Sequence, residues 1–148
     1  MSIIPASAND IDIMARTIYG EARSEPWLGQ IQVGLVILNR VRMDLWNDGN
    51  PDWWGEGIAA VCQKPLQFSC WNLHDPNLPK LTDATLDDPA FQHAMAATLN
   101  CILGLAIGVL YDDRITHYYV VGSPMPKWAI GKQPDFTLGK HAFFSNIS

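Results

Sequence analysis

The sequence carries little charge, and less of it is positive than negative. Only 17% of the 148 residues are charged, and 10 Lys and Arg stand against 15 Asp and Glu, which gives a formal net charge of −5. A protein that binds nucleic acid or acidic lipid through its charge needs an excess of positive over negative residues. We therefore expect neither nucleic acid nor an acidic membrane surface among its partners.

Cysteines and long apolar runs are also scarce. The three Cys, at positions 62, 70 and 101, cannot all pair within one chain, and an odd count favours a reducing compartment over a disulfide-rich secreted scaffold. The uncharged stretch 94–111 is interrupted by polar residues and glycines. These interruptions favour a buried core helix over a membrane span, so no stable membrane insertion is expected.

What the chain does contain suits one globular domain. Its length is close to the commonest domain size, and 48% of its residues are hydrophobic, so a single domain over 1–148 and a monomer are expected. The first twelve residues hold no basic residue and no long apolar run, the two parts of a secretory signal. We therefore expect the chain to be made in the cytoplasm.

Helical spacing of apolar residues dominates the first two thirds of the chain. Asn9 and Asp10 are suitable N-caps for the first helix, and Asp88 and Pro89 open the last. The second helix is apolar on nearly every side, which places it at the centre of the fold. The helices predicted from this spacing span about 10–23, 26–43, 58–63 and 89–102.

The remaining segments predict loops and a small β element. The stretch 46–57 is rich in turn residues and Trp, which indicates a surface loop, and 67–81 is broken by prolines and is expected to lack regular structure. The run 115–121 is β-branched and aromatic, as strands are, and 141–144 can pair with it. The pattern is mostly helical, with an antiparallel β element near the C-terminus.

Glu21 is the first residue that could carry chemistry. At 100° per residue it lies on the border of the apolar stripe of the first helix, where a carboxyl group is partly removed from water. Such an environment suits a general acid. Helix geometry alone leaves open the commoner alternative, a solvated side chain near a helix end.

Four motifs follow one another along the chain. The first, Tyr19-Gly20-Glu21-Ala22-Arg23 with Leu38-Asn39-Arg40-Val41, is similar to the opening of the spore-cortex-lytic, SleB-type cell wall hydrolases. Further matches are Gln67-Phe68-Ser69, Thr116-His117-Tyr118-Tyr119 and Gly139-Lys140-His141-Ala142-Phe143-Phe144. The resemblance spans nearly the whole chain.

The resemblance implies a lysozyme-like α+β domain that cleaves the glycan strands of peptidoglycan, with Glu21 as the catalytic acid. As a lytic transglycosylase it would cut the bond between N-acetylmuramic acid (MurNAc) and N-acetylglucosamine (GlcNAc). Glu21 would then act as the base on the C6 hydroxyl of the muramoyl residue. A hydrolytic muramidase is the alternative and needs a second carboxylate. Glu25, Asp112 and Asp113 are candidates, although capping of the second helix is expected for Glu25 and turn formation for the two Asp.

Five further residues are candidates for substrate binding. Gln67, Phe68 and Trp71 lie in an irregular segment, where an amide can bond to acetamido groups and flat rings can contact sugars. Anchoring of this loop in the core is the alternative. Tyr118 and Tyr119 alternate along a strand, so only one is expected to face a cleft. His117 and His141 are expected to be structural.

Two other functions remain open from the sequence. A Cys70-dependent peptidase or amidase is suggested by Ser69-Cys70-Trp71 with histidines downstream, and a noncatalytic glycan-binding module by Trp46, Trp53 and Trp54. No metal-ligand spacing is present, so no metal and no cofactor are expected. A single-domain wall-lytic enzyme without a secretory signal also resembles a bacteriophage endolysin. Such a protein waits in the host cytoplasm until the inner membrane is opened.

Overall fold

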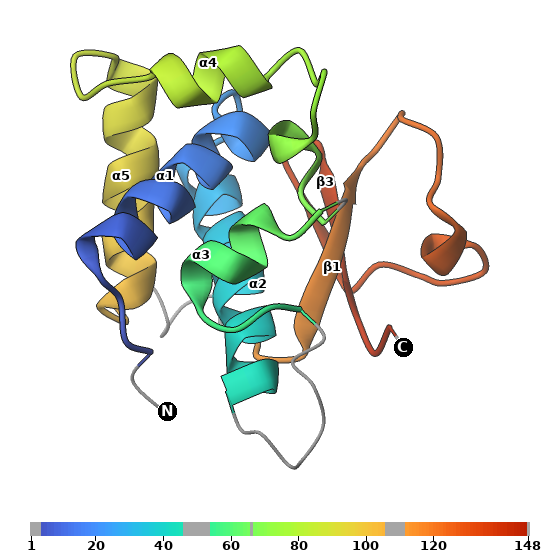
Figure 1. The fold of residues 1–148 in the computed structure, drawn as a ribbon. Coiled ribbons are helices and arrows are strands. Elements are labelled where there is room, and N and C mark those ends of the chain that lie inside the picture. Colours follow the sequence, from blue (N-terminus) through green and yellow to red (C-terminus); the bar gives the residue numbers. More distant parts are fainter. Residues whose placement is uncertain (1–3, 46–53, 66, 106–111, 148) are drawn as a thin grey trace.

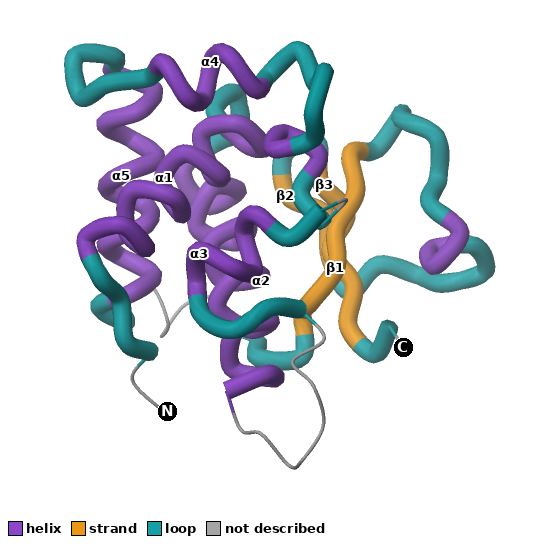
Figure 2. Tube along the Cα trace, viewed as in Figure 1, coloured by secondary structure: helices purple, strands orange, loops and turns teal. Residues whose placement is uncertain are grey.

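The computed structural model describes residues 4–45, 54–65, 67–105 and 112–147, and shows a group of helices beside a small sheet (Figures 1 and 2). In chain order the elements are α1 (Ala8–Ala22), α2 (Trp27–Leu45), α3 (Ile58–Gln63), η1 (Ser69–Trp71), α4 (Leu78–Asp83), α5 (Pro89–Ile102), β1 (Ile115–Val120), η2 (Lys127–Ala129), β2 (Phe136–Leu138) and β3 (His141–Ser145).

Helix α1 begins earlier than the sequence predicted. Ser7, not Asn9 or Asp10, is the N-cap, because its hydroxyl accepts from the backbone N–H of Asp10 and the Asp10 carboxylate accepts from the N–H of Ser7. This reciprocal capping box satisfies two amides that the start of a helix leaves unpaired. The helix buries the predicted stripe, including Met14 and Ile18.

Helix α2 occupies the predicted central position. It packs against α1, α3 and α5 on the helical side and against β1 on the other. Residues around its whole circumference are buried, from Ile31 to Val41. An enclosed helix of this kind forms the wall between the helical layer and the sheet, and its side chains can reach both.

Helix α5 confirms the prediction of a capped helix over 89–102. The Asp88 carboxylate accepts from the N–H of Ala90, and Pro89 occupies the first turn. The helix packs on α1 and α2. Residues 106–111, the end of the uncharged stretch, lie outside the described residues. Among those that are described, no helix is long and apolar enough to cross a bilayer.

The segment 67–81 is more regular than predicted. It contains the 3₁₀ turn η1 and the start of α4, where Pro79 lies in the first turn and so costs no hydrogen bond. The guanidinium of Arg16, on α1, donates to the carbonyls of Leu81 (2.7 Å) and Ala84 (2.9 Å). These contacts satisfy carbonyls near the end of α4, and a local sequence pattern does not reveal them.

The sheet has the order β1-β3-β2, with both pairs antiparallel. The predicted pairing of 115–121 with 141–144 is confirmed, with Tyr118 opposite Phe143. Strand β2 was not predicted. Phe143 belongs to the main core, whereas Phe144 packs with Ala129 in a smaller cluster. One face of β3 therefore contacts the helical core, and the other contacts the connection between β1 and β2.

Candidate active site

Glu21 lies at the end of α1, where its carboxylate meets two other segments. The Tyr118 hydroxyl of β1 donates to Oε1 at 2.6 Å. The backbone N–H of Cys70 and the hydroxyl of Ser69, both in η1, donate to Oε2 at 3.3 Å and 3.5 Å. Each carboxylate oxygen is thus positioned by a different element.

The approach of η1 to α1 depends on Gly20. A Cβ at this position would lie 2.7 Å from Cβ of Cys70 and 2.9 Å from a methyl group of Leu81, closer than packed carbon atoms approach. The indole N–H of Trp71 holds η1 in place by donating to Oγ1 of Thr17 at 2.9 Å. Because Gly20 directly precedes Glu21, η1 can approach α1 closely enough for the Cys70 amide to reach the Glu21 carboxylate.

Tyr118 keeps its phenolic proton at neutral pH and so remains a hydrogen-bond donor. Burial is the main cause that raises the pKa of its phenol well above 10, and the neighbouring Glu21 carboxylate raises it further. The ring packs against His141 (4.9 Å) and Phe143 (5.7 Å). These contacts fix the direction in which the phenol points.

Arg40 is a site residue that the sequence analysis did not single out, although it lies within a matched motif. Its side chain is only 6% exposed, and Nε donates to the carbonyl of Thr116 at 2.8 Å. The guanidinium carbon lies 4.4 Å from the ring centroid of Trp54 and 5.1 Å from that of Phe68. Burial lowers the Arg40 pKa to about 10, so it stays charged at neutral pH.

A pocket of about 280 Å³ opens beside the Glu21 carboxylate. Four of the five predicted substrate-binding residues line it: Gln67, Phe68, Tyr118 and Tyr119. Trp71 is not among its lining residues, and its hydrogen bond to Thr17 anchors the loop. Phe68 presents little surface to the pocket, because it is 2% exposed and packs in the core.

Both strand tyrosines border this pocket, but, as the alternation along the strand predicts, only one of them is directed at Glu21. Tyr118 points to Glu21, while Tyr119 packs on the opposite side against Phe144 and Trp128. Strand β1 is at the edge of the sheet, and residues on both faces of an edge strand can reach one pocket.

The side-chain amide nitrogen of Gln67 is hydrogen-bonded to backbone carbonyls of the preceding segment. It donates to the carbonyls of Val61 (2.6 Å) and Trp54 (3.2 Å). Trp54 is partly buried against Arg40, so this residue of the predicted surface loop forms part of the site wall. Trp46 and Trp53 lie outside the described residues.

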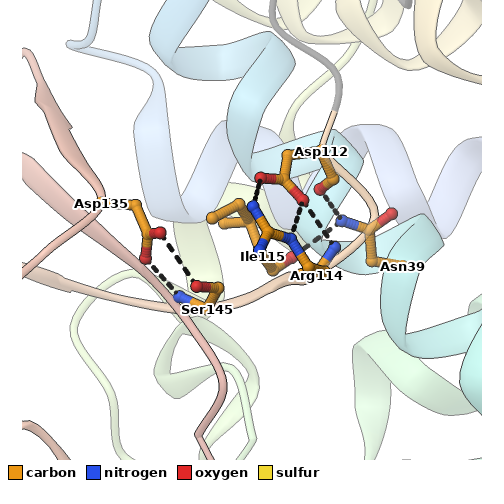
Figure 3. Close-up of polar contacts among 6 residues, drawn as sticks. All are labelled: Asn39, Asp112, Arg114, Ile115, Asp135 and Ser145. Carbon is orange, nitrogen blue, oxygen red and sulfur yellow. Dashed lines mark hydrogen bonds and ion pairs between the residues drawn. The ribbon is translucent and has the colours of Figure 1, made fainter.

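Of the other carboxylates considered for catalysis, Glu25 and Asp112 hold the sheet and its turns, and Asp113 is exposed. Glu25, expected to cap α2, is 5% exposed and accepts from the N–H of Lys140 at 2.8 Å. Gly139 has a φ of +59°, and a Cβ there would lie 2.7 Å from the Glu25 carboxylate. Asp112 pairs with Arg114 at 2.8 Å, while its carbonyl accepts from Asn39 (Figure 3).

His141 also has a structural position. Its Nδ1 lies 3.0 Å from Oε1 of Glu25, close enough for an ion pair but without hydrogen-bond geometry. Burial lowers the His141 pKa although Glu25 opposes the shift, so the neutral form is favoured. His117 is held between Trp54 and Trp128, and burial together with the charge of Arg40 lowers its pKa to about 4.

Cys70 does not have the environment of a nucleophile. Its thiol is fully buried, and burial raises its pKa, as does the neighbouring Glu21. A cysteine nucleophile reacts as the thiolate. All three cysteines are unpaired, and the described residues contain no group of His, Cys, Asp and Glu that could hold a metal ion.

Taken together, these residues form the kind of site used in acid–base catalysis, with one carboxylate held by three donors in an open pocket. A family model described as cell wall hydrolase matches residues 24–144, and the chain belongs to this family. The match begins three positions after Glu21. It includes Arg40, Cys70 and Tyr118.

Relatives and solved structures agree with this membership. The chain is 26% identical to the spore cortex-lytic enzyme of Bacillus subtilis and 28% identical to that of Halalkalibacterium halodurans, over 93% and 95% of its length. It spans 38% and 36% of those proteins. The crystal structure of the catalytic domain of Bacillus cereus SleB matches with a TM-score of 0.65 and 28% identity, covering 97% of this chain and 96% of that one. The catalytic domain of the germination-specific lytic transglycosylase SleB from Bacillus anthracis gives 0.64 and 28%, covering 95% and 98%.

Proposed function

We propose that the chain cleaves the MurNAc–GlcNAc bond of peptidoglycan as a lytic transglycosylase, with Glu21 as acid and then base. The observation that carries this proposal is the Glu21 carboxylate, which is held by Tyr118 and the η1 backbone at the wall of an open pocket. Membership of the cell wall hydrolase family supports the substrate, and the structural match to the lytic transglycosylase SleB of Bacillus anthracis supports the reaction.

The reaction requires one carboxyl group that changes role. Protonated Glu21 gives its proton to the glycosidic oxygen as the bond from that oxygen to C1 of the muramoyl residue breaks. The resulting carboxylate then takes the proton of the C6 hydroxyl while O6 bonds to C1 and closes a 1,6-anhydro ring. No water is consumed, and Glu21 ends the cycle protonated.

The composition of the pocket supports this mechanism over hydrolysis. Glu21 is the one acidic side chain among the described residues that line it. A hydrolytic enzyme places a second carboxylate about 5–9.5 Å from the first, as nucleophile or as base for water. Glu25 is bound to the turn before β3 and Asp112 to Arg114, so each already has a structural role.

The neighbours of Glu21 can each assist in a different way. The Tyr118 hydroxyl and the Cys70 amide orient the carboxyl group and stabilise it once its proton has gone. The positive charge of Arg40, which interacts with both Glu21 and Tyr118, adds to this stabilisation. Because these groups are fixed by packing, they do not need to reorganise during the reaction.

Mass spectrometry of muropeptides released from purified peptidoglycan tests the proposal. The wild type should release products lighter by one water than reducing muropeptides, and Glu21→Gln should release none. Glu56→Gln is the matched control, because it makes the same change at an exposed position outside the pocket. Reducing products would indicate a muramidase instead. Cuts in the stem peptide that survive Glu21→Gln would overturn the proposal and direct attention to Cys70.

We also propose, from the sequence, the cellular role of a bacteriophage endolysin. Expressed in the cytoplasm of a Gram-negative host, the protein should cause lysis only after the inner membrane is permeabilised. The turbidity of the culture before and after permeabilisation measures this, with Glu21→Gln as the inactive control. Lysis of cells whose inner membrane is intact would contradict the role.

A further inference from the structure

A second pocket lies next to the one that contains Glu21. It has a volume of about 260 Å³, and its walls come from α2, the segment before and after α3, β1 and η2. Arg40 and Gln67 line both pockets, so the two are neighbours across these side chains. Each is slightly smaller than the roughly 300–1,000 Å³ usual for small-molecule sites, and suits one chemical group of a larger substrate.

Two basic side chains line this second pocket, in a protein whose formal net charge is −5. Arg40 and Lys64 line it, and no acidic side chain is found among its described lining residues. His117, which also lines it, is neutral at neutral pH because its pKa is lowered to about 4. The remaining lining residues are Gln67, Pro65 and the aromatic Trp54 and Trp128.

The guanidinium of Arg40 has hydrogen-bond donors that no described residue uses. Its Nε is bonded to the Thr116 carbonyl, but within the described ranges its two terminal amino groups have no hydrogen-bond or ion-pair partner. Arg40 lines both pockets, and a planar guanidinium can bond to both oxygens of a carboxylate at once. A carboxylate in the second pocket would supply the missing partner.

We propose that the second pocket binds a carboxylate carried by the O3 substituent of the muramoyl residue whose glycosidic bond lies at Glu21. This inference rests on the proposed function and adds a determinant of specificity to it. The substituent offers two sources of the group, its own lactyl carboxylate where no peptide is attached and the free carboxylates of the stem peptide. Methyl groups of either source can pack against Trp54 and Trp128.

Binding to the inactive Glu21→Gln protein tests the proposal without catalysis. Isothermal titration calorimetry would compare three probes: GlcNAc–MurNAc oligomers with tetrapeptide stems, the same oligomers without peptide, and GlcNAc oligomers, which have no O3 substituent. Adding Lys64→Gln should weaken binding of at least one carboxylate-bearing probe about fivefold and lower its salt dependence. Binding of GlcNAc oligomers should not change. The probe that responds identifies the source of the carboxylate.

Two further variants make the result decisive. Lys80→Gln, on α4 and outside both pockets, makes the same charge change and should alter no affinity. Arg40→Lys keeps the charge but removes the planar fork, so it should weaken the responding probe about tenfold, provided that circular dichroism shows the native fold. If Lys64→Gln affects all three probes equally or none of them, the proposal is wrong. That result is independent of whether the wild type cleaves glycan.

Discussion

At the scale of single residues, the position of Glu21 depends on groups that are distant in the sequence. Tyr118 is 97 positions away and Cys70 is 49 positions away, and they bind different oxygens of the carboxylate. Replacing the hydrogen-bond partner of either oxygen should therefore disturb the orientation of the Glu21 carboxylate without removing the acid itself. Such a variant shows how much the catalytic step depends on that orientation.

Tyr118→Phe should lower kcat about 10- to 100-fold with a smaller change in KM, because it removes a hydrogen bond to an ionisable group and keeps the ring. The rate of muropeptide release under saturating and subsaturating peptidoglycan measures both constants.

Tyr19→Phe provides the matched control for this prediction. It removes the same kind of bond, from the Tyr19 hydroxyl to the Asp88 carboxylate at 2.9 Å, but at a position that lines neither pocket. It should lower the free energy of unfolding by about 1–2 kcal/mol and leave kcat unchanged. Equal loss of kcat in the two variants would mean that Tyr118 acts through stability alone.

Gly20→Ala should disturb the site by steric pressure. The new methyl group would overlap Cys70 and Leu81, so η1 must move away from α1 and the Cys70 amide from Glu21. We expect a loss of about 1–3 kcal/mol in the free energy of unfolding, as for other overpacked cores, together with lower activity. Urea denaturation and the muropeptide assay measure the two effects. An unchanged midpoint of urea denaturation would show that η1 moves without any loss of stability.

The sequence motifs contain the residues around Glu21 but not their contacts. Glu21 and Tyr118 each lie in a matched motif, and the structure brings them together. Arg40 was not predicted as a site residue, because a basic residue on an apolar helix is equally consistent with a solvated side chain. Only the packing of Trp54 and Phe68 on its guanidinium shows that it is enclosed.

At the scale of elements, local signals predict helices and strands well when the stabilising groups are themselves local. The Asp88 cap and Pro89 define the start of α5, and β-branched residues define β1. Strand β2 has three residues and exists because β3 offers it an edge. Helix α4 is held by Arg16 from α1. The interactions that form these two elements are tertiary.

The sheet carries a pH dependence through His117 on β1. Its folded pKa of about 4 lies below the usual 6.5, so between these values the unfolded chain binds more protons than the folded one. Stability therefore falls as the pH drops from 6.5 towards 4, by about 1–2 kcal/mol once the partial exposure of the ring to water is taken into account. Urea denaturation at several pH values should show that His117→Phe loses less stability over this interval than the wild type.

His93→Gln is the control for this pH effect, because His93 is exposed on α5. Its stability profile should follow that of the wild type. If His117→Phe shows the same acid loss as the wild type, other groups must cause it. Protonation of His141, whose pKa is also lowered, would then be the next candidate.

At the scale of the whole molecule, residues from the helices and from the sheet together line the pocket with Glu21. Figure 1 shows the helices and the sheet side by side. Glu21 comes from the first helix, Tyr118 from the edge strand, and Arg40 from the helix between the two layers. Movement of the layers relative to each other would separate the acid from its partners. The site therefore requires that helices and sheet fold as one unit.

The three cysteine thiols can report whether the helices and the sheet unfold as one unit. Cys62, Cys70 and Cys101 are buried in the main core, and burial raises the pKa of each, so none should react with a disulfide reagent in the native state. If the chain is one cooperative domain, all three should become reactive at the same urea concentration, coincident with the change in tryptophan fluorescence. Colorimetric thiol titration along the denaturation curve measures this. A thiol that reacts at lower urea would show that part of the core opens separately, and the part that opens can be identified by which cysteine is labelled.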